Sequence, residues 1–465
     1  MGGQFGLCRQ YHQGNERCLE PGADGRVRAG ARADGANGAE AVSEFCGLSS
    51  GVPPAGVGVI RVSGPQAKAA LAALAGRVPS PRRASLARLR NAEGALLDEA
   101  LVLWFPGPNT VTGEDLAEFH CHGGRAVIAA VDGALAVLPG LRRAEPGEFT
   151  RRAFANGRID LAEAEGLADL LSAETELSRA AALVNAGGAL SRQIEGWREQ
   201  VLGLSAEVEG VLDFSDEEDS SDLPECFTWN IASLCGELGE WLARPRSERL
   251  GEGFRVVLAG PPNVGKSTLF NALVDSEAAI TSPIAGTTRD VIERSVAIAG
   301  VPFTFVDTAG LREGAADAIE AIGIARAEAQ LARADVVLWL GTAGEGPPDA
   351  WEIAAQADRE GFVPKPDACF VLSAVTGEGV ASLKTTLVDA ASDALPKPGE
   401  AALNARQHAL LSEAAAALAA AKRVSDPLLV AEELRRTRLA FDRLIGRATT
   451  EDMLDTLFGR FCIGK

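Results

Sequence analysis

The residues best suited to chemistry lie in the segment GPPNVGKST, Gly260 to Thr268. This segment fits the pattern GxxxxGKS/T, and it stands between an apolar run at 255–259 and a stretch with helical spacing. In such loops the backbone N–H groups surround nucleotide phosphates, a lysine reaches the β- and γ-oxygens, and a hydroxyl binds Mg²⁺. We therefore predict a phosphate site in which Lys266 and Ser267 take these two roles.

Two further motifs follow this loop in the order that a GTPase requires. GTTRD at 286–290 places Thr288 where it can bind Mg²⁺, and DTAG at 307–310 follows an apolar strand. Asp307 then supplies a carboxylate beside the metal, and Gly310 supplies a backbone contact to the γ-phosphate. Because the three elements occur in the right order, the sequence predicts a P-loop GTPase.

The loop that should recognise the base departs from the usual NKxD, whose carboxylate accepts hydrogen bonds from guanine. AQAD at 355–358 is the best-placed candidate, although its first two residues are replaced. PKPD at 364–367 keeps the lysine and the aspartate, but leaves no room for a strand and loop before SAV at 373–375. We favour Asp358 as the residue that recognises the base. Two alternatives stay open: Asp358 lies on an ordinary exposed turn, or the altered loop relaxes the choice of base. The predicted nucleotide contacts are Asn263, Val264, Gly265, Lys266, Ser267, Thr268, Ser282, Pro283, Ile284, Ala285, Gly286, Thr287, Thr288, Asp307, Thr308, Ala309, Gly310, Asp358, Ser373 and Ala374.

Hydrolysis calls for a water-orienting group other than the usual glutamine, because Leu311 follows DTAG. Glu320, in the segment after DTAG, can orient water directly or through a second water. The side-chain oxygen of Asn263, with the backbone carbonyls of Ser282 and Ile284, can hold a monovalent cation where other GTPases place an arginine. Considered one at a time, each residue has a commoner explanation: Asn263 forms a turn, and Glu320 is a solvated residue at the start of a helix.

Several domains must position these motifs. Short apolar runs separated by clusters of Gly, Pro and Asn predict an N-terminal α+β domain. In two later stretches apolar residues recur every three or four positions, which predicts long helices. The segment between these two stretches alternates strands with helices. The predicted fold is multidomain α/β, in which a doubly wound, Ras-like P-loop domain interrupts one discontinuous helical domain. The predicted domains are 42–158 (α+β), 159–250 and 396–465 (helical), and 251–395 (P-loop).

The composition and the N-terminal residues indicate which partners and which cellular compartment to expect. The 45 basic and 64 acidic residues give a net charge of −19, which disfavours broad attraction to nucleic-acid phosphates. No apolar run reaches the roughly 18 residues of a membrane span, and the eight cysteines show no disulfide framework, so we expect a cytoplasmic protein. Residues 1–41 are rich in glycine and show no periodic spacing of hydrophobic residues, which predicts a disordered tail. The stretch from Val42 reads like a normal start, so this tail need not be native.

Further stretches join the GTPase motifs, among them FPGPNTVTGEDLAEFHCHGG at 105–124, PGEFTRRAFANGRIDLAEAEGLADL at 146–170 and the terminal CIGK. With them the chain resembles the MnmE (TrmE) family of tRNA modification GTPases over 44–465. The resemblance implies a potassium-dependent GTP hydrolase whose G domains dimerise, and an N-terminal domain that dimerises and binds a 5-formyltetrahydrofolate-type one-carbon carrier. It implies K⁺ at Asn263, Ser282, Ile284 and Thr287, Mg²⁺ at Ser267 and Thr288, and water oriented by Glu320.

By position, Arg61, Glu118, Arg158 and the terminal Lys465 match the family's folate contacts. Arg158 stands where a lysine is common, which keeps the charge but changes the geometry. In the family the terminal tail folds back towards the folate pocket, so Cys462 would be a thiol delivered to chemistry. Whether it acts as a nucleophile stays open, and a packing role among its apolar neighbours is the alternative.

The resemblance further implies an FAD-containing partner of the MnmG (GidA) type, with which the homodimer forms a heterotetramer. Together they add an aminomethyl or carboxymethylaminomethyl group to C5 of the wobble uridine of certain tRNAs, which are bound mainly through the partner. Two alternatives stay open. One is a ribosome-assembly GTPase, although such proteins usually carry a basic RNA-binding module, which we do not find in this sequence. The other is a folate-sensing scaffold whose GTPase times partner binding.

Overall fold

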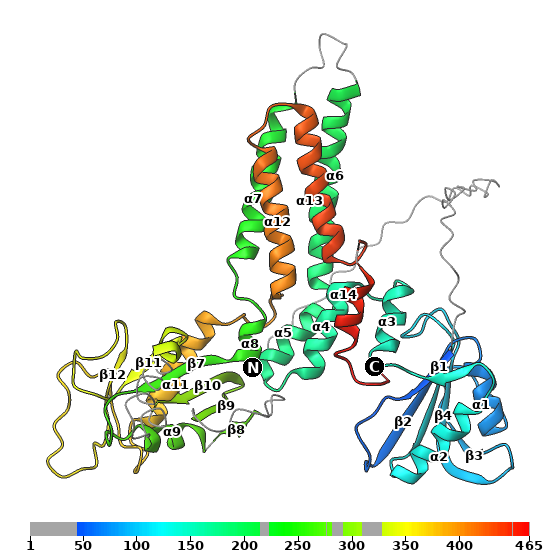
Figure 1. Ribbon diagram of the computed structural model, residues 1–465, viewed down its shortest axis with the longest axis horizontal. Coiled ribbons are helices and arrows are strands. Elements are labelled where there is room, and N and C mark those ends of the chain that lie inside the picture. The colour runs from blue at the N-terminus through cyan, green and yellow to red at the C-terminus, as the bar shows by residue number, and fades with distance from the viewer. Residues whose placement is uncertain are drawn as a thin grey trace, which may run out of the picture. The chain divides into compact units, whose positions relative to one another are not determined.

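A computed structural model describes residues 44–213, 223–275, 277–280, 292–308, 328–448 and 450–464 (Figure 1). Contacts divide the chain into Met1–Val42 and Ser43–Lys465, and all elements named below belong to the second unit. The tail predicted at 1–41 lies outside the described residues. Within the described ranges, we find no helix with the length and apolar character that a membrane crossing requires.

The N-terminal region is a six-stranded sheet with helices α1 (Ala67–Ala75) and α2 (Arg125–Ala136) packed against it (Figure 1). Side chains alternate between the two faces, so Ile60, Val102 and Phe119 are buried with the helices and the intervening residues form a second, open face. Neighbouring strands are antiparallel except β1 and β6. In sheet order they are β3 (Ser85–Arg90), β4 (Leu96–Phe105), β5 (Leu116–His122), β2 (Val57–Ser63), β1 (Glu44–Leu48) and β6 (Leu141–Arg143).

The P-loop region contains a seven-stranded sheet whose central strand is β7 (Phe254–Ala259). Strands β13, β12, β11, β7 and β10 are parallel, and β9 and β8 extend the sheet antiparallel. Later strands flank β7 on both sides, so the chain order reverses there, which is where open α/β sheets bind ligands. The other elements are α9 (Lys266–Val274), β8 (Ala278–Ala279), β9 (Ile292–Ile298), β10 (Val301–Asp307), β11 (Val336–Trp339), β12 (Trp351–Ala354), β13 (Phe370–Val371) and α11 (Val380–Ala394).

Helices from both sides of this insert share one core (Figure 1). Trp197 on α6 stacks on Phe441 on α13 with ring centroids 6.0 Å apart, and both residues are fully buried. Residues of α7 and α12 complete the same cluster, which confirms the predicted discontinuous helical domain. The helices are α3 (Glu148–Ala155), α4 (Leu161–Ser172), α5 (Glu176–Ala186), α6 (Ala189–Asp213), α7 (Glu225–Leu242), α8 (Glu248–Glu252), α12 (Ala405–Ala421), α13 (Pro427–Leu444) and α14 (Glu451–Phe458).

Candidate functional site

The loop at 260–265 connects the central strand β7 to helix α9. Gly265, the residue before the helix, has a φ of +100°, a conformation that L side chains rarely adopt. A Cβ at this position would also lie 3.2 Å from Nε2 of Gln356. The loop therefore sets the N-terminus of α9 at the carboxyl end of the parallel strands, where the backbone N–H groups of a helix start can accommodate a phosphate.

Lys266 and Ser267, the first residues of α9, contact the loop and strand β10. The Lys266 side chain is buried, and its Nζ donates hydrogen bonds to the carbonyl oxygens of Gly260 at 2.9 Å and Pro261 at 2.7 Å. Ser267 Oγ donates to Oδ2 of Asp307 at 2.7 Å, and Asp307 is fully buried at the end of β10. Hydroxyl and carboxylate oxygens are ligands that Mg²⁺ prefers, so this pair fits the ion.

The predicted base-recognition loop follows β12. Asp358 Oδ1 accepts a hydrogen bond from Oγ of Ser373 at 2.6 Å, and this bond lowers the pKa of the Asp358 carboxyl. Ser373 follows β13, so the structure brings together two predicted base contacts from two different loops. Thr308, by contrast, donates its hydroxyl to the carbonyl oxygen of Leu258 at 2.8 Å, and its side chain supports the sheet.

Gln356, which replaces the lysine of NKxD, joins the base loop to the phosphate loop. Its Nε2 donates to the backbone oxygen of Asn263 at 3.2 Å, and both residues have a φ of +64°. Lys365, from the alternative motif PKPD, donates to the Trp339 carbonyl and pairs with Glu352, both at 3.0 Å. The lysine of PKPD is thus held at the ends of β11 and β12, whereas AQAD contacts the phosphate loop.

A second polar cluster lies on the open face of the N-terminal sheet. Strand register sets Arg61 on β2 opposite Glu118 on β5, and Arg61 Nε donates to Glu118 Oε1 at 2.9 Å. His120 Nε2 lies 2.9 Å from the other carboxylate oxygen of Glu118, whose side chain is 12% exposed. His120 was not among the residues predicted from the sequence. The two-residue period of a strand, counted from Glu118, would have set it on the same face.

Arg158 lies against the loop that precedes β5. A Cβ on Gly113 would come within 3.3 Å of its Cγ and Cδ atoms. The exposed Arg158 side chain forms no ion pair with any residue that the structure describes. Arg152, on α3, pairs with Glu114 of the same loop at 2.7 Å. The structure thus brings Arg61 and Glu118 into contact and sets Arg158 at a neighbouring loop.

The C-terminal tail folds onto the N-terminal sheet (Figure 1). Phe461 is buried among residues of α4 and α14, and Ile463 forms an antiparallel bridge with Pro146. Ser49 Oγ donates to the carbonyl oxygen of Gly464 at 2.6 Å. Because these contacts involve successive residues of the tail, it is held against the edge of the domain.

This docking sets the tail next to the strand that pairs with Arg61. Gly464 has a φ of +89°, and a Cβ there would lie 2.1 Å from the carbonyl oxygen of Leu48, so only glycine fits. Gly47, the residue opposite Arg61 in the β1–β2 pair, would bring a Cβ within 3.4 Å of the Gly464 backbone. Cys462, two residues before Gly464, is exposed and lies beyond the end of α14.

Comparisons with known proteins cover nearly all of the described region. The family described as MnmE helical domain matches residues 161–462, and the one described as GTP-binding protein TrmE N-terminus matches residues 44–158. The tRNA modification GTPase MnmE of Erythrobacter litoralis is 65% identical over 418 residues, which cover 90% of this chain and 99% of that protein. Its counterpart from Novosphingobium aromaticivorans is 63% identical over 430 residues, with 90% and 98% covered.

The chain belongs to the MnmE family. This membership confirms the resemblance that the motifs indicated. Several MnmE site residues predicted from the sequence lie outside the described residues, so their roles stay predictions. They are Ser282, Pro283, Ile284, Ala285, Gly286, Thr287, Thr288, Ala309, Gly310, Glu320 and Lys465.

Proposed function

We propose that this MnmE-family chain is a cytoplasmic, K⁺- and Mg²⁺-dependent GTP hydrolase that acts in tRNA modification as a homodimer with an FAD-containing partner of the MnmG type. The modified atom is C5 of the wobble uridine, to which an aminomethyl or carboxymethylaminomethyl group is added using a one-carbon unit from a 5-formyltetrahydrofolate-type carrier. The supporting observation is that one chain holds a phosphate loop with an adjacent Ser267–Asp307 pair and docks its cysteine-bearing tail beside the Arg61–Glu118 cluster.

On the nucleotide side, the chain's own residues bind and orient GTP. The loop N–H groups hold the β-phosphate, Lys266 balances the charge of the β- and γ-oxygens, and Asp358 accepts from the base. Bound Mg²⁺, held by Ser267 and Thr288 with Asp307 close by, neutralises charge on the phosphates. Glu320 orients the attacking water.

We expect GTP hydrolysis to be at least about tenfold faster in K⁺ than in Na⁺ at matched ionic strength and constant Mg²⁺. A K⁺ ion on Asn263, Ser282, Ile284 and Thr287 adds positive charge where other GTPases place an arginine. Because Gln356 fixes the backbone of Asn263, Gln356→Ala should raise the K⁺ concentration that gives half-maximal rate. Steady-state phosphate release measures both, and equal rates in the two salts would exclude the cation site.

On the N-terminal side, the Glu118 carboxylate is suited to a pterin. Its two oxygens can accept hydrogen bonds from the amino group and ring N–H of the carrier, and they are already aligned by Arg61 and His120. Cations suit the glutamate end of the carrier, a role for Arg158 and Lys465. The same open face carries exposed apolar side chains, which supports dimerisation through it: Val57, Leu86 and Leu101.

Glu118→Gln is expected to weaken binding of 5-formyltetrahydrofolate by about 10- to 100-fold, because a charge-assisted acceptor becomes a neutral amide. Isothermal titration of the full chain measures this affinity. Glu99→Gln is the matched control, since Glu99 lies on β4 of the same sheet and pairs with the exposed Arg88 at 2.6 Å. An unchanged affinity in Glu118→Gln would place the carrier elsewhere.

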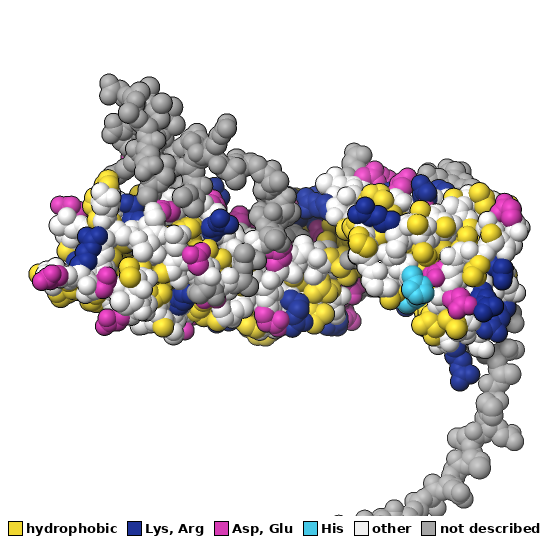
Figure 2. Space-filling model, turned by 90° about the horizontal axis from the view of Figure 1, so that it is seen from below, with side chains coloured by type: hydrophobic (Ala, Val, Ile, Leu, Met, Phe, Trp, Pro, Cys, Tyr) yellow, Lys and Arg dark blue, Asp and Glu magenta, His cyan; other side chains and the backbone are white. Residues whose placement is uncertain are grey.

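The charge distribution supports delivery of tRNA by a partner. The net charge is −19, and Figure 2 shows Lys and Arg side chains scattered among acidic and hydrophobic ones on one face of the molecule. Such a surface is poorly suited to unaided binding of a polyanion. The remaining alternative is a folate-sensing scaffold without RNA chemistry, and Cys462, discussed below, separates the two.

A further inference from the structure

One edge of the N-terminal sheet is rich in arginine. Residues 77–90 lead from the end of α1 through strand β3, which lies at the edge of the sheet (Figure 1). This stretch contains five arginines and no acidic residue, in a chain whose net charge is −19. Such a local reversal of charge indicates a surface for an anionic partner. We call it the arginine edge, and its members, all exposed, are Arg77, Arg82, Arg83, Arg88 and Arg90.

The fold brings these side chains to one place. Arg88 and Arg90 lie two residues apart on β3, so they share one face of the strand at a spacing of about 7 Å. Arg77, beyond the end of α1, reaches the same strand, because its Nη2 donates to the carbonyl oxygen of Leu86 at 3.2 Å. The other two arginines directly precede β3. The five positive charges therefore follow one strand edge.

Most of this charge is not neutralised by the protein. Three of the guanidinium groups donate to backbone carbonyl oxygens, and that of Arg83 forms no hydrogen bond or ion pair within the described ranges. Arg88 pairs with Glu99 on the neighbouring strand β4 at 2.6 Å. Asp98, the other carboxylate of β4, lies 2.7 Å from Nδ1 of His122. Positive charge therefore remains in excess at this edge.

Arg82 is held in a conformation that suggests a function. Its φ is +59°, which is uncommon for a residue with a side chain. Its backbone N–H donates to the carbonyl oxygen of Trp104 at 2.8 Å. Its guanidinium lies 5.7 Å from the centre of the Phe105 ring and donates to the backbone oxygen of Asn109. Such fixed backbone outliers concentrate at functional sites, and an arginine already held loses little entropy on binding.

We propose that the arginine edge binds the phosphate backbone of the tRNA on which the chain acts. This inference rests on the proposed function, and it names a surface for the RNA. Guanidinium groups match phosphate oxygens in a bidentate geometry, and such contacts orient a nucleic acid without reading its bases. An acidic protein segment would also carry negative charge, but RNA is the polyanion that a tRNA modification enzyme must position.

The arginine edge and the docked C-terminal tail lie on opposite sides of the same sheet. Four strand spacings separate β3 from β1, beside which Gly464 packs, a distance of about 19 Å. An RNA anchored at β3 would therefore keep neighbouring nucleotides within reach of Cys462. Because the net charge opposes capture by the rest of the chain, the edge would orient a tRNA that the partner delivers.

The test is the affinity of the full chain for an unmodified tRNA transcript with a wobble uridine, measured by fluorescence anisotropy at several KCl concentrations. Combining Arg83→Ala with Arg90→Ala should lower the affinity by about tenfold or more in low salt. It should also reduce the slope of log affinity against log salt by about 1.4 to 1.8, the value for two lost phosphate contacts. Arg83→Lys with Arg90→Lys should restore most of this slope, since the charges remain.

The matched control combines Arg435→Ala with Arg436→Ala, two adjacent exposed arginines on α13 that pair with carboxylates of the same helix. It should bind the transcript like the wild type. Equal losses in both double variants would indicate general attraction and overturn the proposal. GTP hydrolysis at the wild-type rate verifies that each variant is folded.

Two further results would contradict the arginine edge in different ways. If the wild type binds the transcript and the Arg83 and Arg90 variant keeps its salt slope, the RNA lies elsewhere, and the proposed function is unaffected. If that variant instead loses affinity for the FAD-containing partner, the surface belongs to a protein interface. A wild type that neither binds the transcript nor supports modification with its partner would contradict the proposed function itself.

Discussion

Replacing Lys266 by alanine is expected to lower kcat/KM for GTP hydrolysis by at least about a hundredfold, the loss typical of one preorganised charged donor in a phosphate or oxyanion site. The ammonium is buried and held by two carbonyl oxygens of the phosphate loop, so it needs little reorganisation when GTP binds. Without it, the negative charge of the β- and γ-oxygens loses a fixed partner in the transition state. Phosphate release under single-turnover conditions measures the chemical step directly.

Lys384→Ala is the matched control for this loss. Lys384 is a mostly buried lysine on α11 of the same domain, and it pairs with Glu277 at 2.7 Å, away from the phosphate loop. Both variants remove an ammonium and a long side chain, so effects of net charge are equal. A rate in Lys266→Ala within a few-fold of that in Lys384→Ala would show that the loop does not act on the phosphates.

The phosphate loop could be predicted from sequence because its geometry is local. The glycine spacing, the lysine and the hydroxyl occupy eight consecutive residues, and the structure brings Lys266 and Ser267 to the expected loop. The contact between Gln356 and Asn263 joins residues 93 positions apart, and it replaces a motif residue that the sequence lacks. No local pattern indicates such a pairing, since tertiary structure alone brings the two loops together.

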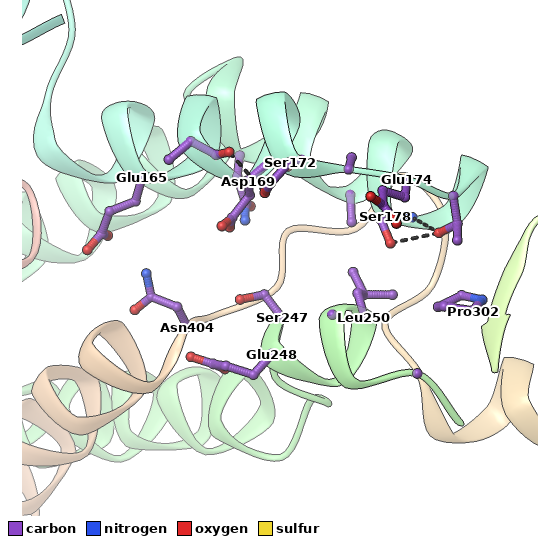
Figure 3. Close-up of a pocket in the computed structure, with 18 of the residues that line it drawn as sticks. Glu165, Asp169, Ser172, Glu174, Ser178, Ser247, Glu248, Leu250, Pro302 and Asn404 are labelled. Carbon is purple, nitrogen blue, oxygen red and sulfur yellow. Dashed lines mark hydrogen bonds between the residues drawn. The ribbon is translucent and has the colours of Figure 1, made fainter. Parts of the chain in front are cut away.

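In the N-terminal domain, too, local features could be predicted from the sequence and long-range pairings could not. Short apolar runs predicted an α+β domain, but the strand order, with β1 between β2 and β6, depends on pairings that the runs do not specify. His120 shares a face with Glu118 through the two-residue period of β5, a local signal that the sequence contains, whereas its contact with the carboxylate is seen only in the structure. The cavity that Glu165, Asp169, Glu248 and Asn404 line (Figure 3) could not be predicted for a similar reason, because its walls come from helices and loops more than two hundred residues apart. The docking of the tail was expected from family resemblance and not from residue spacing.

Cys462→Ser is expected to reduce wobble-uridine modification by about a hundredfold or more, the scale of loss when a group that takes part in the chemistry is removed. GTP hydrolysis should stay at the wild-type rate, since Cys462 lies with the tail at the N-terminal sheet. The assay is mass spectrometry of nucleosides from tRNA incubated with the chain, its partner, GTP and the one-carbon carrier.

The setting of this cysteine differs from that of the buried cysteines in the same domain. Burial raises the pKa of Cys46 to about 11 and that of Cys121 to about 12, so both remain neutral thiols packed among apolar residues. Cys462 is exposed, yet its backbone is held in place, because its carbonyl oxygen accepts a hydrogen bond from the backbone N–H of Gly147 at 3.3 Å. This exposure argues against a packing role for Cys462, and it leaves the thiol accessible for the role that the prediction assigns to it.

Cys369→Ser is the matched control, because Cys369 is also exposed but lies beside β13 in the nucleotide domain. It should leave modification unchanged. If Cys462→Ser supports full modification, the thiol takes no part in the chemistry, and the result favours the folate-sensing scaffold. Should it lose modification and folate binding together, the tail would act by shaping the pocket. Retained folate binding with lost modification is the result that a reacting thiol requires, since serine keeps the size and polarity of the side chain but not the nucleophilicity of a thiolate.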